Sequence, residues 1–180
     1  MKTKKEKEEP KVVEVKKDSG IVYSGGASIK IVKNGKVIKT VNQHNSGNGP
    51  LFEFLARCLA GNYFPNDRPT CLRVGNYTVG ADPEYDELSL TYVNATTSTT
   101  SYSGGTYYAN ISFSFPATLI KYNEVTSEKK LNCLRISSLN NNAGDGWENY
   151  SAQLIFDGIA NLTADMSLLV VWSMSIATQV

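Results

Sequence analysis

The chain has 180 residues, of which 41% are hydrophobic, and it carries 18 Lys and Arg against 17 Asp and Glu. This length and apolar content predict a single domain with a real hydrophobic core. The longest apolar run, Leu168–Trp172, is far shorter than the roughly 18 to 20 residues of a membrane-spanning helix, so no membrane partner is expected.

The near-neutral total hides an uneven charge distribution. Residues 1–52 hold eleven lysines and five acids, a surplus of six positive charges, whereas residues 53–180 hold seven Lys or Arg and twelve acids, a deficit of five. A basic segment before a mildly acidic domain is typical of an arm or docking surface that binds a partner.

The basic part begins with a charged arm, residues 1–19, which contains no aromatic residue. Such a segment cannot bury enough apolar surface to fold alone, so we expect it to order only on a partner. Acids and Pro10 follow the first lysines where a signal peptide would be apolar, so secretory export is not expected. The lysines predicted to bind the partner are Lys4, Lys5, Lys7, Lys11, Lys16 and Lys17.

The clearest local signal is a hairpin over residues 27–42, in which Asn34-Gly35 is a type I′ turn pair between β-branched residues. A two-residue turn sets Lys33 opposite Lys36 and Lys30 opposite Lys39, so that like charges are neighbours. An anionic partner would offset this repulsion, and we predict these four lysines as partner-binding residues. The alternative is that they only protect an exposed edge from aggregation.

One short helix is predicted over residues 50–60, with Pro50 in its first turn and Gly61 after its end. The glycine-rich approach, Asn45–Gly49, lacks the Lys-Ser/Thr ending of a phosphate-binding loop, so we interpret it as a turn.

The rest of the domain, which we place at residues 20–180, has short apolar segments separated by turn clusters, a pattern typical of an all-β antiparallel sandwich, immunoglobulin-like or jelly-roll-like. Two polar tracts, Asn94–Gly105 and Asn140–Gly146, are predicted as exposed loops. The predicted strands are Thr70–Val74, Leu88–Val93, Tyr107–Phe115, Ala117–Tyr122, Leu131–Ser137, Tyr150–Phe156 and Ser167–Ile176.

No catalytic set is recognisable, and no enzymatic activity is predicted. His44 is the single histidine and is expected in a loop, with no nucleophile motif elsewhere. The acids at 82–87 and the loop at 140–148 lack the geometry of a calcium site, so neither a metal nor another cofactor is expected. The cysteines Cys58, Cys71 and Cys133 match no disulfide or zinc pattern and are predicted to be buried, reduced thiols.

Three tyrosines near the Ser/Thr tract, Tyr102, Tyr107 and Tyr108, form a candidate contact loop for a glycan or a protein, since tyrosine offers rigid amphipathic area. Sequence-specific nucleic-acid binding is not expected, because the basic patch contains lysine alone, without arginine or interleaved aromatic residues.

Five segments after the hairpin form a recognisable set: Leu59–Gly61, Arg68–Gly75, Leu131–Ser137, Ala152–Asp157 and Leu168–Ile176 with its tryptophan. With these segments the chain resembles the small β-rich virion proteins of tailed bacteriophages. A lysine-rich arm before a sandwich is most similar to an auxiliary capsid, or decoration, protein of crAss-like phages, in which an N-terminal extension clamps neighbouring capsomers.

The resemblance implies a structural protein that is assembled in the host cytoplasm into the virion. Its partners would be the major capsid protein or other virion proteins, and self-association is compatible with that role. Two alternatives stay open: a head-fibre or tail/baseplate protein, and, from another class, a carbohydrate-binding module that uses the tyrosine loop.

Overall fold

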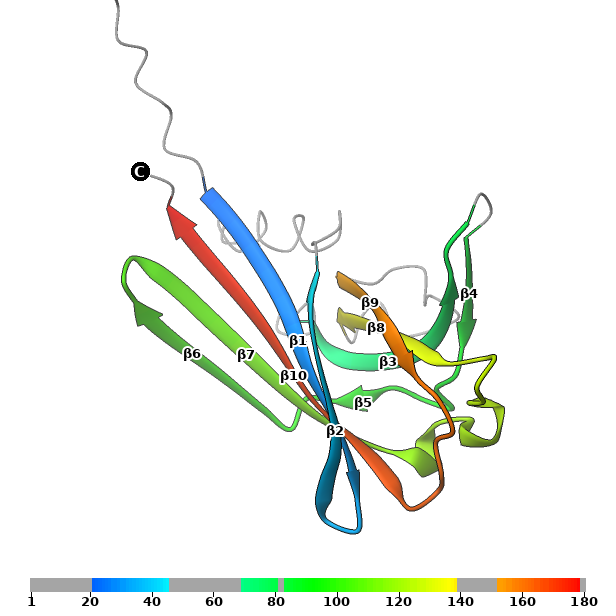
Figure 1. The fold of residues 1–180 in the computed structure, drawn as a ribbon. Helices are drawn as coiled ribbons and strands as arrows, with labels where there is room; N and C mark the ends of the chain where they lie inside the picture. Colours follow the sequence, from blue (N-terminus) through cyan, green and yellow to red (C-terminus); the bar gives the residue numbers. More distant parts are fainter. Residues whose placement is uncertain (1–20, 46–68, 81–82, 139–151, 179–180) are drawn as a thin grey trace, which may run out of the picture.

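The computed structural model describes residues 21–45, 69–80, 83–138 and 152–178, which form two antiparallel five-stranded sheets (Figure 1). Sheet A has the order β2-β1-β10-β7-β6; sheet B has the order β4-β3-β8-β9, with β5 also paired to β3. The predicted all-β antiparallel sandwich is therefore confirmed. The arm, the helix at 50–60 and the loop at 140–146 lie outside the described residues.

The strands in chain order are β1 (Ile21–Lys33), β2 (Lys36–Asn45), β3 (Pro69–Thr78), β4 (Glu84–Glu87), β5 (Val93–Asn94), β6 (Thr97–Ser103), β7 (Thr106–Pro116), β8 (Leu131–Ser138), β9 (Ala152–Ile159) and β10 (Met166–Thr178). Two 3₁₀ turns, η2 (Ala117–Leu119) and η3 (Tyr122–Glu124), connect β7 to β8.

The core lies between the two sheets and is built by strands that alternate buried and less buried residues. In β7, Ile111, Phe113 and Phe115 are buried while the serines between them are not, as the sequence pattern predicts. Trp172 of β10 is the largest fully buried side chain, and leucines of sheet B join the same cluster.

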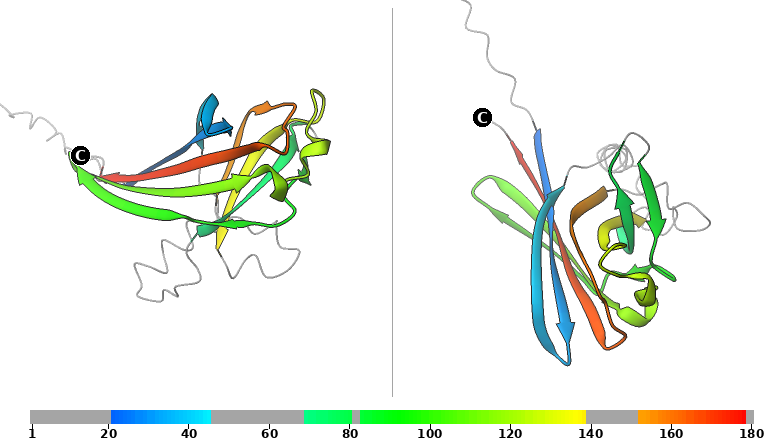
Figure 2. Two further views of the ribbon diagram at one scale, coloured as in Figure 1. Left: turned by 90° about the horizontal axis from the view of Figure 1, so that it is seen from below. Right: turned by 45° about the vertical axis from the view of Figure 1, so that its right-hand side comes forward.

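Sheet A is longer than sheet B. Its central strands β1 and β10 have 13 residues each and β7 has 11, and their far ends run on past sheet B (Figure 2). The β6–β7 hairpin and the beginning of β1 therefore lie on a part of sheet A that sheet B does not cover.

The predicted lysine hairpin is present, and both turn residues have positive φ, 49° at Asn34 and 72° at Gly35. The register expected from a two-residue turn holds for Lys33 with Lys36 and for Val32 with Val37, and it is wrong beyond them. Lys33 faces Lys36, but a β-bulge follows, so that Ile31 faces Lys39 and Lys30 faces Thr40. The like-charge pair of Lys30 and Lys39 does not form.

The bulge has a packing reason. By inserting Ile38 as an extra residue, it brings the partly buried Val41 opposite the fully buried Ile29. Without it the polar Thr40 would face Ile29. The cost is that Ile38 turns outward and is 54% exposed.

Two predicted strands, 88–93 and 117–122, are also wrong, except that Val93 begins the short strand β5. Only a single bridge, Ser89 to Ile120, joins these segments, and Ala117–Leu119 is a 3₁₀ turn. Pro116, which has no N–H to donate to a sheet, stands immediately before that turn.

The polar tract predicted as a loop contains a seven-residue strand, β6. It pairs with β7 along its whole length, from Thr97 opposite Ser112 to Ser103 opposite Thr106. Its residues are all exposed, so no apolar alternation marks it in the sequence.

Candidate functional site

The four hairpin lysines do not form one uniform surface. The ammonium of Lys33 lies 3.3 Å from a carboxylate oxygen of Asp165, in the turn between β9 and β10. The Nζ of Lys39 donates to the carbonyl oxygen of Gly158 on β9, at 3.5 Å. These two lysines therefore help to hold the hairpin against the end of the domain.

The surroundings of Asp165 favour its ionised form, which this contact requires. The Thr163 hydroxyl donates a hydrogen bond to its carboxylate, and this bond, together with Lys33, lowers the pKa of Asp165 below its ordinary value. The carboxylate thus stays ionised at neutral pH, and the contact weakens only as the pH falls towards the pKa of a free aspartate and below it.

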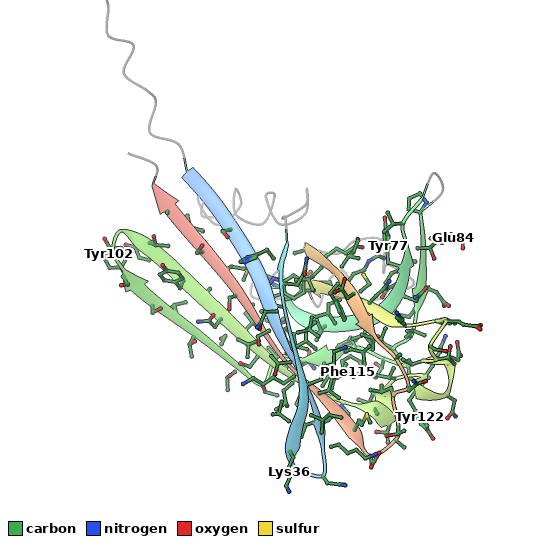
Figure 3. All side chains as sticks on the ribbon, in the orientation of Figure 1. Lys36, Tyr77, Glu84, Tyr102, Phe115 and Tyr122 are labelled. Carbon is green, nitrogen blue, oxygen red and sulfur yellow. The ribbon has the colours of Figure 1, made fainter. Side chains whose placement is uncertain are left out.

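Lys30 and Lys36 are exposed and form no ion pair within the described part of the chain. Lys36 lies at the tip of the hairpin, which forms one end of the molecule (Figure 3). Val37 and Ile38 beside it are 53% and 54% exposed. The tip therefore offers free positive charge next to apolar side chains, a combination suited to a protein surface with acidic and apolar groups.

The beginning of the fold lies at the opposite end from this tip. Strand β1 starts at Ile21 and needs all 13 of its residues to reach the turn, a span of about 40 Å at roughly 3.3 Å per residue (Figure 1). The predicted arm lysines, Lys4 to Lys17, lie outside the described residues.

A shallow groove of about 320 Å³ crosses sheet A on the face turned away from sheet B. At its floor the glycine pair of β1 allows a close approach of β2: a Cβ on Gly26 would lie 2.6 Å from the carbonyl oxygen of Gln43. Its polar side chains are hydroxyl, amide, imidazole and phenol groups, from Ser24, Ser28, Asn42, Gln43, His44, Tyr108, Ser173 and Ser175. Ala27 and Met174 also line it, and most of its lining surface is apolar.

The structure corrects the position of His44, which belongs to β2 rather than to a loop. The sequence reasoning missed this groove. The available signal was the alternation of serines in β1 and β10, because it predicts a polar face opposite a buried one.

The three tyrosines of the candidate contact loop lie on two different faces. Tyr102 of β6 and Tyr107 of β7 are directly opposite each other, with ring centroids 4.7 Å apart. They lie on the same face of sheet A as the buried residues of β7, but beyond the part that sheet B covers. Tyr108, the next residue, lies on the other side and lines the groove. Tyr102 and Tyr107 are 62% and 64% exposed (Figure 3 labels Tyr102).

A second polar cluster, which sequence reasoning also missed, holds β4 on sheet B. The buried Arg135 guanidinium lies 3.6 Å from the centre of the Tyr85 ring and donates to Gln153 at 2.7 Å. Arg73 pairs with Glu87 at 3.4 Å, and burial raises the pKa of Tyr85 above its ordinary value. Since every polar group here has a protein partner, the cluster is best explained as structural.

Cys71 and Cys133 are fully buried thiols, as predicted, and are not joined in a disulfide, whereas Cys58 lies outside the described residues. Burial raises the pKa of Cys133 to about 12. Because the thiolate is the reactive form, neither buried thiol is placed to act as a nucleophile.

We therefore expect Cys71 and Cys133 of the native protein to react slowly with a thiol reagent near neutral pH. From a pKa of about 12 instead of 9.0, the thiolate fraction of Cys133 falls by about a thousandfold, and burial adds a barrier to the reagent. Mass spectrometry of the labelled peptides over time would measure both rates, with the urea-unfolded protein as control. Rapid labelling of either cysteine in the native state would contradict its described burial.

The described residues contain no group of three or more His, Cys, Asp or Glu side chains placed to hold a metal ion. Within those same ranges, no helix is long and apolar enough to cross a bilayer. Comparison of the chain with protein-family models, with curated proteins and with solved structures finds no match.

Proposed function

We propose that this protein is a structural virion protein of a tailed phage, an auxiliary capsid protein that binds the shell through its N-terminal arm and its lysine hairpin. The observation that carries the proposal is the hairpin surface: Lys30 and Lys36 have no acidic partner within the described residues, and Val37 and Ile38 are exposed. The resemblance to phage virion proteins supplies the identity of the partner.

The arrangement of the two basic elements supports a bridging role. The arm joins the fold at Ile21, about 40 Å along β1 from the hairpin turn. In the proposed role, the hairpin contacts one shell subunit and the arm, which precedes Ile21, contacts a neighbouring one. In this role the sandwich is a spacer, and its stability rather than any catalytic group matters for assembly.

Charge reversal at the two unpaired lysines tests the proposal. The variant Lys30→Glu/Lys36→Glu should bind capsid shells that lack the protein at least tenfold more weakly than wild type, and its binding should depend less on salt, because exposed charges are screened over about 8 Å at physiological ionic strength. Co-sedimentation with purified shells at two salt concentrations would measure both effects. Folding should be unchanged, since surface substitutions usually change stability by less than about 0.5 kcal/mol.

The matched control is Lys121→Glu, compared with Lys36→Glu alone; it makes the same charge change between η2 and η3 and should bind as wild type does. Deleting residues 1–17 in the same assay tests the arm, and should reduce loading while leaving the melting transition in place. If the hairpin variant binds shells with wild-type affinity and salt dependence, the lysines protect an edge and the hairpin part of the proposal fails. If neither change alters loading, attachment through these elements is wrong.

The groove favours a second candidate function, carbohydrate binding, because its hydroxyl and amide side chains can hydrogen-bond to a sugar and the Tyr108 ring can stack on it. Binding to a glycan array that is lost in Tyr108→Ala, without any binding to shells, would favour this function. A stable trimer in solution would instead favour a head-fibre or tail protein.

A further inference from the structure

Strand β6 is an unprotected sheet edge. It ends the strand order of sheet A, so one side of its backbone has no strand partner among the described elements. All seven residues, Thr97 to Ser103, are exposed, and none is charged or proline. Backbone N–H and C=O groups along such an edge are a ready template for another strand.

The other edges of the described sheets are protected in ways that β6 is not. Strand β2 carries Lys36 and Lys39 and a bulge, and it contacts the opposite edge strand β9. Strand β4 has only four residues, three of them acidic, and β5 has only two residues. The contrast within one molecule indicates that β6 is kept open for pairing rather than shielded against it.

We propose that β6 pairs antiparallel with β6 of a second copy of this chain, which joins two five-stranded sheets into one continuous sheet across a two-fold axis. If the two-fold axis is perpendicular to the sheet, the same face of each copy lies on the same side of the joined sheet. In that arrangement all seven residues of β6 are paired only when the axis passes beside Thr100. That register sets Thr100 opposite Thr100 and Ser98 opposite Tyr102 of the partner copy. No charge meets a like charge, so the strand is compatible with itself.

The position of Tyr102 on β6 also favours pairing at this edge. The Tyr102 ring contacts the Tyr107 ring of the neighbouring strand in a tilted arrangement, with an interplanar angle of 43°. In the paired register the exposed Tyr102 ring gains the partner's Ser98 as a direct cross-strand neighbour, so part of its 62% exposed surface becomes covered. The resulting contact is small, so a dissociation constant on the order of micromolar is expected.

The test is an exchange of charge at the centre of the proposed contact. Sedimentation velocity of the full chain at up to about 100 µM should show a dimer for wild type. Thr100→Lys and Thr100→Glu should each weaken the dimer by about two- to fivefold, because like charges would face each other directly. An equimolar mixture of the two variants should restore the dimer. Ser114→Lys, an exposed position of β7 outside the β6 pairing, is the control and should dimerise as wild type does.

Thermal melting of each variant would show that it is folded, and no shells are present, so the result is independent of the capsid proposal. A wild-type chain that is monomeric throughout this concentration range would overturn the inference. A mixture that stays monomeric would do the same, because it would exclude self-pairing at Thr100. If the dimer survives both Thr100 substitutions but is lost on deletion of residues 1–17, a neighbour's arm occupies the interface and β6 self-pairing is wrong.

Discussion

Trp172→Ala should lower the free energy of unfolding by about 3 to 5 kcal/mol, the range for removal of a buried aromatic side chain. Trp172 is fully buried on β10, between Ala27 of β1 and Ile111 of β7, and belongs to the core that joins the two sheets. Its indole Nε1 has no hydrogen-bond partner among the described residues, so the expected loss comes from packing and from the cavity left behind.

Urea unfolding followed by far-ultraviolet circular dichroism would measure this loss, since the method does not depend on tryptophan fluorescence. The matched control is Leu169→Ala on the same strand, where the side chain lies on the opposite face and is 39% exposed. We expect it to cost less than about 1 kcal/mol. Equal losses for the two variants would mean that Trp172 does not sit in the core as described.

The features that the sequence predicted correctly are those set by neighbouring residues. Asn34-Gly35 specifies its turn through the positive φ of both residues, and the alternation from Ile111 to Phe115 specifies a strand with one buried face. Neither depends on contacts with distant parts of the chain, and both are present.

The features that the sequence did not predict depend on distant contacts or on exposure. The hairpin bulge follows from matching Val41 to Ile29 against the core, and the ion pair of Lys33 requires Asp165, more than a hundred residues away. Strand β6 has no buried residue and therefore no apolar period, so only the β propensity of its threonines could have marked it.

The candidate surfaces divide in the same way. The lysine-rich sequence predicted the hairpin surface. Only the three-dimensional structure shows that Lys33 and Lys39 contact other parts of the domain, whereas Lys30 and Lys36 form no ion pair among the described residues. Tyr107 and Tyr108 are adjacent in sequence yet lie on opposite faces, because successive side chains of a strand alternate. That alternation could have been applied once β7 was predicted to contain both residues.

Gly75→Ala should destabilise the domain by about 1 to 3 kcal/mol, the usual cost of overpacking a tight contact. Gly75 lies on β3 opposite Glu87 of β4, and a Cβ there would overlap the Tyr85 ring and stand 2.7 Å from the carbonyl oxygen of Asp86. Because that oxygen belongs to the backbone, β4 itself has to move, which separates the Tyr85 ring from Arg135.

Two measurements would check this outcome. Urea unfolding gives the stability change, with Gly80→Ala as the control, since a Cβ at Gly80 would meet no atom within 4 Å and its substitution should change stability by less than about 0.5 kcal/mol. Compared with wild type, Gly75→Ala should increase the rate of amide hydrogen exchange in β4 but not in β7 or β10. The displaced β4 loses pairing with β3, while the strands of sheet A are unchanged. Equal stability of the two variants, or unchanged exchange in β4, would show that Tyr85 does not pack over Gly75 and that β4 is held by other contacts.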